Sequence, residues 1–152
     1  MTQPHPKAPT PNDPEPFQEE YYFFYGTLMN QNLLARILQH PARLDLRPAR
    51  ITGWRCLMWG EYPALIESDP EDTIIGKAYR VCSIRERERL LQYETAAYRV
   101  QGCTIYFDDG TCRPGKTFVW DGDVGVLREG DFDWRYWVPK EKEVQHQGMF
   151  LC

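Results

Sequence analysis

The residue best suited to move protons is Glu94, at the end of a predicted helix that begins at Ser83 and runs to about Tyr93. Glu94 lies three residues after Leu91 and four after Leu90, and these spacings put its carboxylate on the apolar face of the helix. It also lies at the helix C-terminus, where the dipole disfavours an anion. Burial and the dipole both raise the pKa of a carboxyl group. The sequence therefore predicts that Glu94 is a general acid or base.

A second interpretation of Glu94 is structural. A buried carboxylate can serve as the hydrogen-bond partner of a core tyrosine, here Tyr93, Tyr98 or Tyr106. The spacing of the residues does not separate this interpretation from the catalytic one.

The other feature that could bind a substrate is the turn from Tyr25 to Asn30, between the first predicted strand and the first predicted helix. Amide groups at a helix start, together with the helix dipole, favour an anion such as a carboxylate. Gly26 permits a tight turn and Thr27 adds a hydroxyl group. The turn is not a phosphate-binding or dinucleotide-binding loop, because it lacks the lysine and the further glycines that those loops need. An ordinary structural turn is the alternative.

Cysteine and histidine are not arranged as metal ligands or as a disulfide framework. The five cysteines are an odd number without C-x-x-C spacing, and the three histidines are scattered, so no metal or cofactor is expected. Cys82 and Cys103 lie in strand-like runs and are predicted to be buried apolar residues instead of nucleophiles. No apolar run is long enough to cross a membrane. These features predict a reduced protein of the cytoplasm.

The charge of the chain is unevenly distributed. The net charge is −4, and the first 20 residues contain one lysine against four carboxylates. The remainder is close to neutral, which argues against binding to nucleic acid. The stretch Arg85–Arg89 alternates in sign and is predicted to be a solvated helix face.

The predicted elements place the turn and Glu94 in one mixed domain. Tyr21–Tyr25 is a strand, and Asn30–His40 is a helix with Asn30 as N-cap, ended by Pro41. Ser83 and Glu86 form a capping box at the start of the second helix. The other predicted strands are Ile51–Met58, Ala64–Glu67, Thr73–Val81, Tyr98–Phe107 and Thr111–Trp120. The last two flank Asp108-Asp109-Gly110 and form a hairpin, in which Pro114 indicates a bulge or an edge. This order predicts an α+β fold.

The two ends of the chain differ from this body. Six of the twelve prolines lie in the first sixteen residues, so residues 1–19 are predicted to be a disordered proline-rich arm and residues 20–152 a single domain. A proline-rich ligand for a partner domain is the alternative for the arm. Near the other end, Trp134, Tyr136 and Trp137 predict a short helix that Pro139 stops.

Four segments of the chain resemble one known family. Phe24-Tyr25-Gly26-Thr27-Leu28 is similar to the signature loop of the gamma-glutamylcyclotransferase-like family, which includes the avirulence-induced plant proteins and the gamma-glutamylamine cyclotransferases. Three further segments resemble family motifs in the same order: Trp59-Gly60-Glu61-Tyr62-Pro63-Ala64-Leu65, Ile75-Gly76-Lys77-Ala78-Tyr79-Arg80-Val81, and Leu90-Leu91-Gln92-Tyr93-Glu94 with Tyr98-Arg99.

The resemblance implies a small, mixed, barrel-like sheet flanked by helices, and an enzyme that cyclises a gamma-glutamyl group to 5-oxoproline and releases an amino acid or amine. It implies that Glu94 is the catalytic acid/base and that Tyr98 binds the substrate or covers the cavity, with a plain hydrophobic strand residue as the alternative for Tyr98. The expected partner is a small gamma-glutamyl compound, with no nucleic acid and no membrane, and the expected state is a monomer or homodimer. The implied substrate-binding loop comprises Tyr25, Gly26, Thr27, Leu28, Met29 and Asn30.

Two positions depart from the family pattern beside the glutamate. Gln92 stands where the family has aspartate, and Thr95 stands where it has glycine, which adopts positive φ more readily than a β-branched residue. These departures motivate a second hypothesis, an inactive binding or regulatory protein of the same fold. A third hypothesis is a scaffold that recruits a partner through the proline-rich arm.

Overall fold

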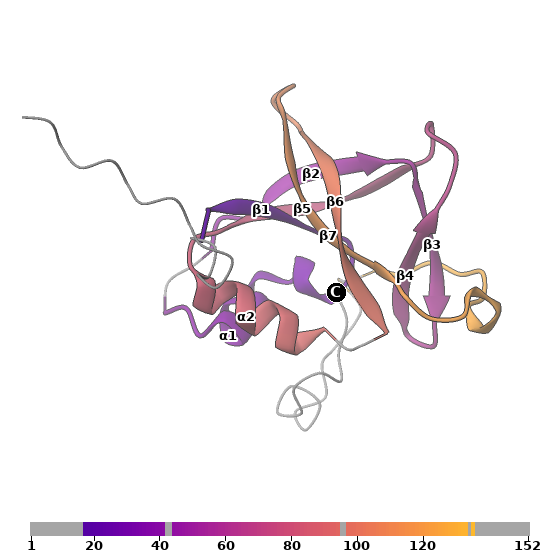
Figure 1. The fold of residues 1–152 in the computed structure, drawn as a ribbon, viewed down its shortest axis with the longest axis horizontal. Coiled ribbons are helices and arrows are strands. Elements are labelled where there is room, and N and C mark those ends of the chain that lie inside the picture. Colours follow the sequence, from indigo (N-terminus) through magenta and orange to yellow (C-terminus); the bar gives the residue numbers. More distant parts are fainter. Residues whose placement is uncertain (1–16, 42–43, 95–96, 134, 136–152) are drawn as a thin grey trace, which may run out of the picture.

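A closed five-stranded barrel forms the centre of the molecule (Figure 1). The structure is a computed structural model and describes residues 17–41, 44–94, 97–133 and 135. Neighbouring strands run antiparallel in the order β1-β5-β2-β6-β7, and β1 and β7 close the barrel as a parallel pair. The barrel and its two helices confirm the predicted α+β fold. The barrel strands are β1 (Glu20–Phe24), β2 (Arg47–Thr52), β5 (Thr73–Val81), β6 (Tyr98–Phe107) and β7 (Cys112–Trp120).

A separate hairpin of β3 (Trp54–Trp59) and β4 (Tyr62–Glu67) stands beside the barrel (Figure 1). The prediction of one strand over Ile51–Met58 is therefore wrong. The chain divides at Gly53, whose φ of 87° belongs to the left-handed region that glycine adopts without strain. This turn takes the chain out of the barrel and into the hairpin.

The helices α1 (Gln31–Leu38) and α2 (Ile84–Tyr93) lie together on one side of the barrel (Figure 1). Asn30 caps α1 as predicted, because its side-chain oxygen accepts from the amides of Asn32 and Leu33. The end of α1 differs from the prediction. The helix stops at Leu38 because Gln39 adopts a left-handed conformation (φ 53°), ahead of Pro41.

The start of α2 confirms Ser83 as the N-cap, since Ser83 Oγ accepts from the amide of Glu86 at 3.1 Å, but the predicted capping box is not closed, because the Glu86 carboxylate accepts from the Cys82 amide instead of that of Ser83. The predicted solvated face over Arg85–Arg89 is wrong at Glu86. This carboxylate is buried and accepts hydrogen bonds from Tyr79 OH at 2.7 Å and from the Cys82 amide at 2.9 Å. Glu86 therefore joins α2 to β5 instead of facing solvent.

The hairpin of β6 and β7 turns at Gly110, which has a φ of 88°. Its register is unbroken at Pro114, which lies opposite Thr104, so the chain has no bulge there. The parallel pairing with β1 begins one residue later, at Gly115. Pro114 therefore occupies a local edge, where its missing N–H breaks no ladder hydrogen bond.

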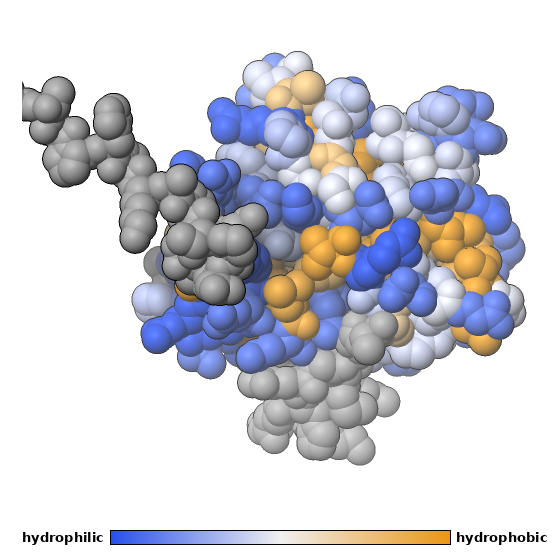
Figure 2. All heavy atoms as spheres, in the orientation of Figure 1, coloured by the Kyte–Doolittle hydropathy of each residue, from blue (hydrophilic) through white to orange (hydrophobic). Residues whose placement is uncertain are grey.

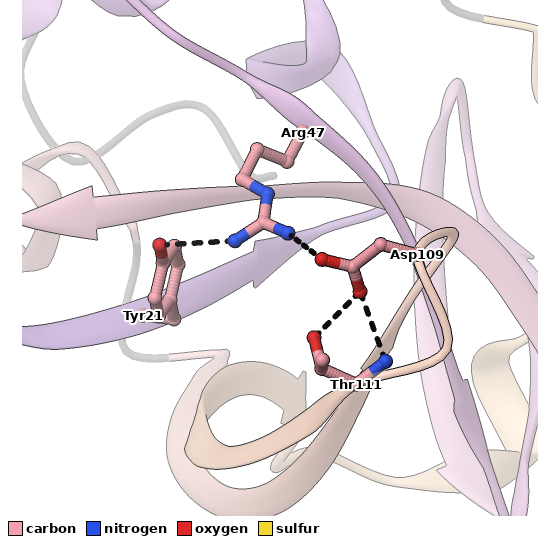
Figure 3. Close-up of polar contacts among 4 residues, drawn as sticks. All are labelled: Tyr21, Arg47, Asp109 and Thr111. Atoms are coloured by element: carbon pink, nitrogen blue, oxygen red, sulfur yellow. Dashed lines mark hydrogen bonds and ion pairs between the residues drawn. The ribbon is translucent and has the colours of Figure 1, made fainter.

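Arg47 links three parts of the barrel (Figure 3). Its guanidinium donates to Tyr21 OH at 3.3 Å and to Asp109 Oδ2 at 3.1 Å, and it lies 4.0 Å from the centre of the Phe107 ring. Thr111 donates its hydroxyl and its amide to Asp109 Oδ1, and these bonds, with a smaller contribution from Arg47, lower the pKa of Asp109. The contacts join β1, β2 and the tip of the β6–β7 hairpin.

The surface is mixed in character. Figure 2 shows hydrophilic side chains over α1 and α2, and apolar side chains on the side of the β3–β4 hairpin and the short helix η2 (Val124–Val126). Val124 and Val126 are among the exposed apolar residues. No helix in the described ranges is long and apolar enough to cross a membrane. The predicted helix around Trp134, Tyr136 and Trp137 lies outside those ranges, as do residues 1–16 of the predicted arm.

Candidate active site

The turn that follows β1 packs directly against the end of α2. After Gly26 the chain forms the short helix η1 (Thr27–Met29) and then enters α1. Thr27 is fully buried, and its Oγ1 lies 2.8 Å from the hydroxyl oxygen of Tyr93, the last residue of α2. This hydrogen bond joins the turn to the residue that directly precedes Glu94 in the chain.

Several amides of this turn are used by the turn itself. The Met29 amide donates to the Gly26 carbonyl, and the Asn30 amide donates to the Thr27 carbonyl, each at 3.1 Å. The Asn30 side chain accepts the next two amides of α1. Of the amides expected from the sequence to bind an anion, those of Met29 and Asn30 therefore already bond within the turn.

The side chains of the turn belong largely to the core. Tyr25, Leu28 and Met29 are buried, and Tyr25 OH donates to the Phe118 carbonyl at 2.6 Å. Tyr25 also lines a cleft of about 200 Å³ with Cys56, residues 73–75 of β5 and residues 130–132. Because these side chains are held by packing and by β7, the turn offers a small ligand mainly its backbone.

Glu94 is buried at the end of α2. Its side chain is 6% exposed, its backbone is extended, and its amide donates to the Leu90 carbonyl at 3.1 Å. Leu90 is fully buried, whereas Leu91 is 42% exposed. The expected burial at a helix C-terminus is therefore found, but the argument from the Leu91 spacing is wrong. Glu94 shares its buried face with Leu90 and Tyr93.

The structure reduces the number of tyrosines that could accept the structural role of partner to the Glu94 carboxylate. Tyr98 donates its single hydroxyl proton to the Pro63 carbonyl at 2.8 Å, so it has no proton left for a carboxylate. Tyr106 lies near the other end of β6, eight residues along the strand from Tyr98, which corresponds to roughly 26 Å. Of the three candidate tyrosines, Tyr93 is adjacent, and its hydroxyl bonds Thr27.

Sequence reasoning missed an aromatic cluster beside this region, composed of Trp59, Tyr98 and Trp120. The ring centres of Trp59 and Trp120 are 5.0 Å apart, and those of Tyr98 and Trp120 are 5.5 Å apart. Tyr98 and Trp120 are directly paired across β6 and β7. The register of the predicted hairpin could have revealed this pair, but the hairpin tip that brings Trp59 to it is a tertiary contact.

The two half-buried cysteines, Cys56 and Cys103, are poorly suited to act as nucleophiles. Cys82 is exposed, so its predicted burial is wrong, whereas Cys103 is half-buried. Burial raises the pKa of Cys103 to about 12 and that of Cys56 to about 11. Such thiols stay protonated at neutral pH and react poorly. The described part of the chain also holds no cluster of three His, Cys, Asp or Glu side chains that could bind a metal ion.

The chain belongs to the gamma-glutamyl cyclotransferase, AIG2-like family, whose sequence profile matches residues 22–138. Family membership supports a cyclotransferase-type enzyme. No curated protein matches the chain closely enough to count as a relative.

Solved structures show the same fold. A protein of Arabidopsis thaliana, solved in solution, is 26% identical with a TM-score of 0.64, covering 84% of this chain and 77% of that one. An AIG2-like protein of Mus musculus is 19% identical with a TM-score of 0.52, covering 76% and 97%. A protein named gamma-glutamyl cyclotransferase is 13% identical with a TM-score of 0.56, covering 69% and 68%. At these identities the last two similarities concern the fold alone.

Proposed function

We propose that this protein is a gamma-glutamyl cyclotransferase in which Glu94 transfers the protons. The observation that supports this most directly is the burial of Glu94 at the end of α2, next in the chain to Tyr93, whose hydroxyl is hydrogen-bonded to Thr27 of the turn after β1. The family match supports the reaction class. A carboxylate placed where both burial and the helix dipole oppose its charge is a candidate general base.

The reaction needs no protein nucleophile, because the substrate carries its own. The alpha-amine of the gamma-glutamyl group attacks its gamma-carbonyl carbon, a new C–N bond closes the five-membered ring, and the bond to the leaving amine breaks. Attack within one molecule in a favourable conformer is worth about 7–11 kcal/mol. The protein must therefore hold the substrate curled and move protons, which a single carboxylate can do.

Glu94 acts in both directions in this proposal. It accepts a proton from the alpha-ammonium group, which makes the amine nucleophilic, and it returns a proton to the departing nitrogen. Backbone N–H groups of the Tyr25–Asn30 turn bind the substrate carboxylate and fix the curl. Tyr98, whose hydroxyl is held by its bond to Pro63, contacts the bound substrate in this proposal.

Of the two departures from the family pattern, the one that lies in the described residues does not conflict with this proposal. Gln92 is exposed on α2, away from the buried face that carries Tyr93 and Glu94. Thr95 lies outside the described residues.

The test is a panel of gamma-glutamyl amino acids, amines and peptides, with 5-oxoproline as the measured product. We expect the protein to release 5-oxoproline from at least one member, and Glu94→Gln to release about 10²–10⁴-fold less while keeping its melting temperature. Full activity in folded Glu94→Gln would overturn the role of Glu94. No product from any compound would overturn the proposed activity and favour the inactive binding protein.

A further inference from the structure

The indole N–H of Trp120 is buried without a hydrogen-bond acceptor among the residues described. Trp120 is 7% exposed, and its Nε1 is enclosed by neighbouring atoms. Leaving a buried donor unsatisfied costs about 1–3 kcal/mol, and native proteins rarely tolerate it without a reason. The Tyr98 hydroxyl in the same aromatic cluster is instead directed to the Pro63 carbonyl, to which it donates at 2.8 Å, and Trp120 Nε1 has no partner among the described residues.

The position of Trp120 connects it to the segment that carries Glu94. Trp120 is the last residue of β7 and is paired with Tyr98, the first residue of β6. The amide of the next residue, Asp121, donates to the Ala97 carbonyl at 2.7 Å. The end of β7 is thus held against the chain just three residues beyond Glu94.

The surroundings of Nε1 favour an uncharged acceptor. Trp59 and Tyr98 present aromatic rings 5.0 and 5.5 Å from the Trp120 ring, measured between ring centres. A single neutral N–H among aromatic rings does not offset the cost of removing a carboxylate from water, whereas it does match an amide carbonyl. The same rings suit a flat or apolar group.

We propose that Trp120 selects the leaving group of the substrate: its Nε1 donates a hydrogen bond to a neutral carbonyl oxygen on the amine that is released, and Trp59 and Tyr98 pack against the apolar part of that amine. This inference rests on the proposed cyclotransferase function. Trp59 is half-buried at the turn of the β3–β4 hairpin, where Gly60 has a φ of 60°, so it is the member of the cluster most open to solvent.

The experiment uses two substrates that differ by one carboxamide, gamma-glutamyl-phenylalaninamide and gamma-glutamyl-phenethylamine. We expect the wild-type protein to have a kcat/KM about tenfold higher for the carboxamide, equivalent to about 1.4 kcal/mol. Trp120→Phe keeps an aromatic ring but removes the N–H. It should abolish this preference by raising KM for the carboxamide while leaving the phenethylamine compound nearly unchanged.

A matched control removes a buried indole N–H outside the cluster. Trp54→Phe should keep the preference, since the unsatisfied donor belongs to Trp120.

The outcomes are distinct. Equal kcat/KM for the two substrates in the wild type, or an undiminished preference in Trp120→Phe, would overturn the inference while the cyclotransferase function stands. The wild-type comparison decides even where Trp120→Phe does not fold. Absence of 5-oxoproline from every compound of the wider panel would instead overturn the proposed function itself.

Discussion

The helix α2 carries two buried glutamates, and their environments are opposite. Glu86 in the first turn is 8% exposed, and Glu94 just past the last turn is 6% exposed. Glu86 lies where the helix dipole favours an anion and accepts two hydrogen bonds, from Tyr79 and from the Cys82 amide. Glu94 lies where the dipole opposes an anion and directly follows Tyr93, which is hydrogen-bonded to the turn after β1. Burial alone therefore does not distinguish a structural carboxylate from a catalytic one.

The comparison teaches that the helix dipole and the hydrogen-bond partners of a buried carboxylate, more than its burial, indicate whether its role is structural. Glu86 is held as a charged cap between α2 and β5, and moving it would cost stability. Glu94 has been placed at an unfavourable helix end beside a turn that is itself held by the Thr27–Tyr93 bond. Proteins accept such placements where a function needs them.

Shortening each glutamate by one methylene should separate the two roles most strongly. Glu94→Asp keeps the charge but withdraws the carboxylate by more than 1 Å, so 5-oxoproline release should fall by about 100-fold. Glu86→Asp should keep the rate within about threefold and lower the melting temperature instead. Equal losses of activity in the two folded variants would remove the distinction between the two sites.

Neutralising Glu86 should cost stability without abolishing turnover. In Glu86→Gln the charged acceptor of Tyr79 OH and the Cys82 amide is lost, and we expect the free energy of unfolding to drop by about 2 kcal/mol in urea titrations. Glu94→Gln should change it by less. A stability loss at position 94 that matched or exceeded that at position 86 would favour a structural Glu94.

The hydrogen bond between Thr27 and Tyr93 should matter for positioning the turn. Thr27→Val removes the hydroxyl with little change of volume, and we expect kcat/KM to fall by about tenfold, or about 1.4 kcal/mol. Thr117→Val is the matched control. Thr117 is also fully buried, and its hydroxyl donates to the Phe23 carbonyl at 3.0 Å, in the barrel. The control should lose stability but retain turnover, and the reverse result would argue against the turn as the substrate site.

The network around Glu86 should also produce the smallest effect, a dependence of stability on alkaline pH. Burial first, and then the bond to Glu86, raise the pKa of Tyr79 above its ordinary value of 10.0. A raised pKa contributes stability that is fully present below pH 10 and is lost as the pH rises above it. The free energy of unfolding should therefore decline above pH 10, less steeply in Tyr79→Phe than in the wild type. The same dependence of the free energy of unfolding on pH in both proteins would contradict the assignment of this effect to Tyr79.

Local patterns predicted much of the fold. The caps at Asn30 and Ser83 depend on residues two or three positions away, and the β6–β7 hairpin depends on Asp109-Gly110 and the flanking strands. Such short-range interactions are determined by residues that are close together in the sequence. The error at Gly53 has the same origin: an apolar run shows no strand boundary when the next strand joins another sheet.

Some parts of the candidate site could be predicted from the sequence, and other parts could not. By itself, the sequence determined where the candidate residues lie, with the turn at Tyr25–Asn30 before one helix and Glu94 at the end of the other, because residue type and position relative to a helix end are local properties. Only the tertiary structure decided that Leu91 faces solvent, that Glu86 is buried against Tyr79, and that Trp59 meets Tyr98 and Trp120. Those outcomes depend on which elements pack together across the barrel, and contacts between residues far apart in the chain leave no periodic trace in it.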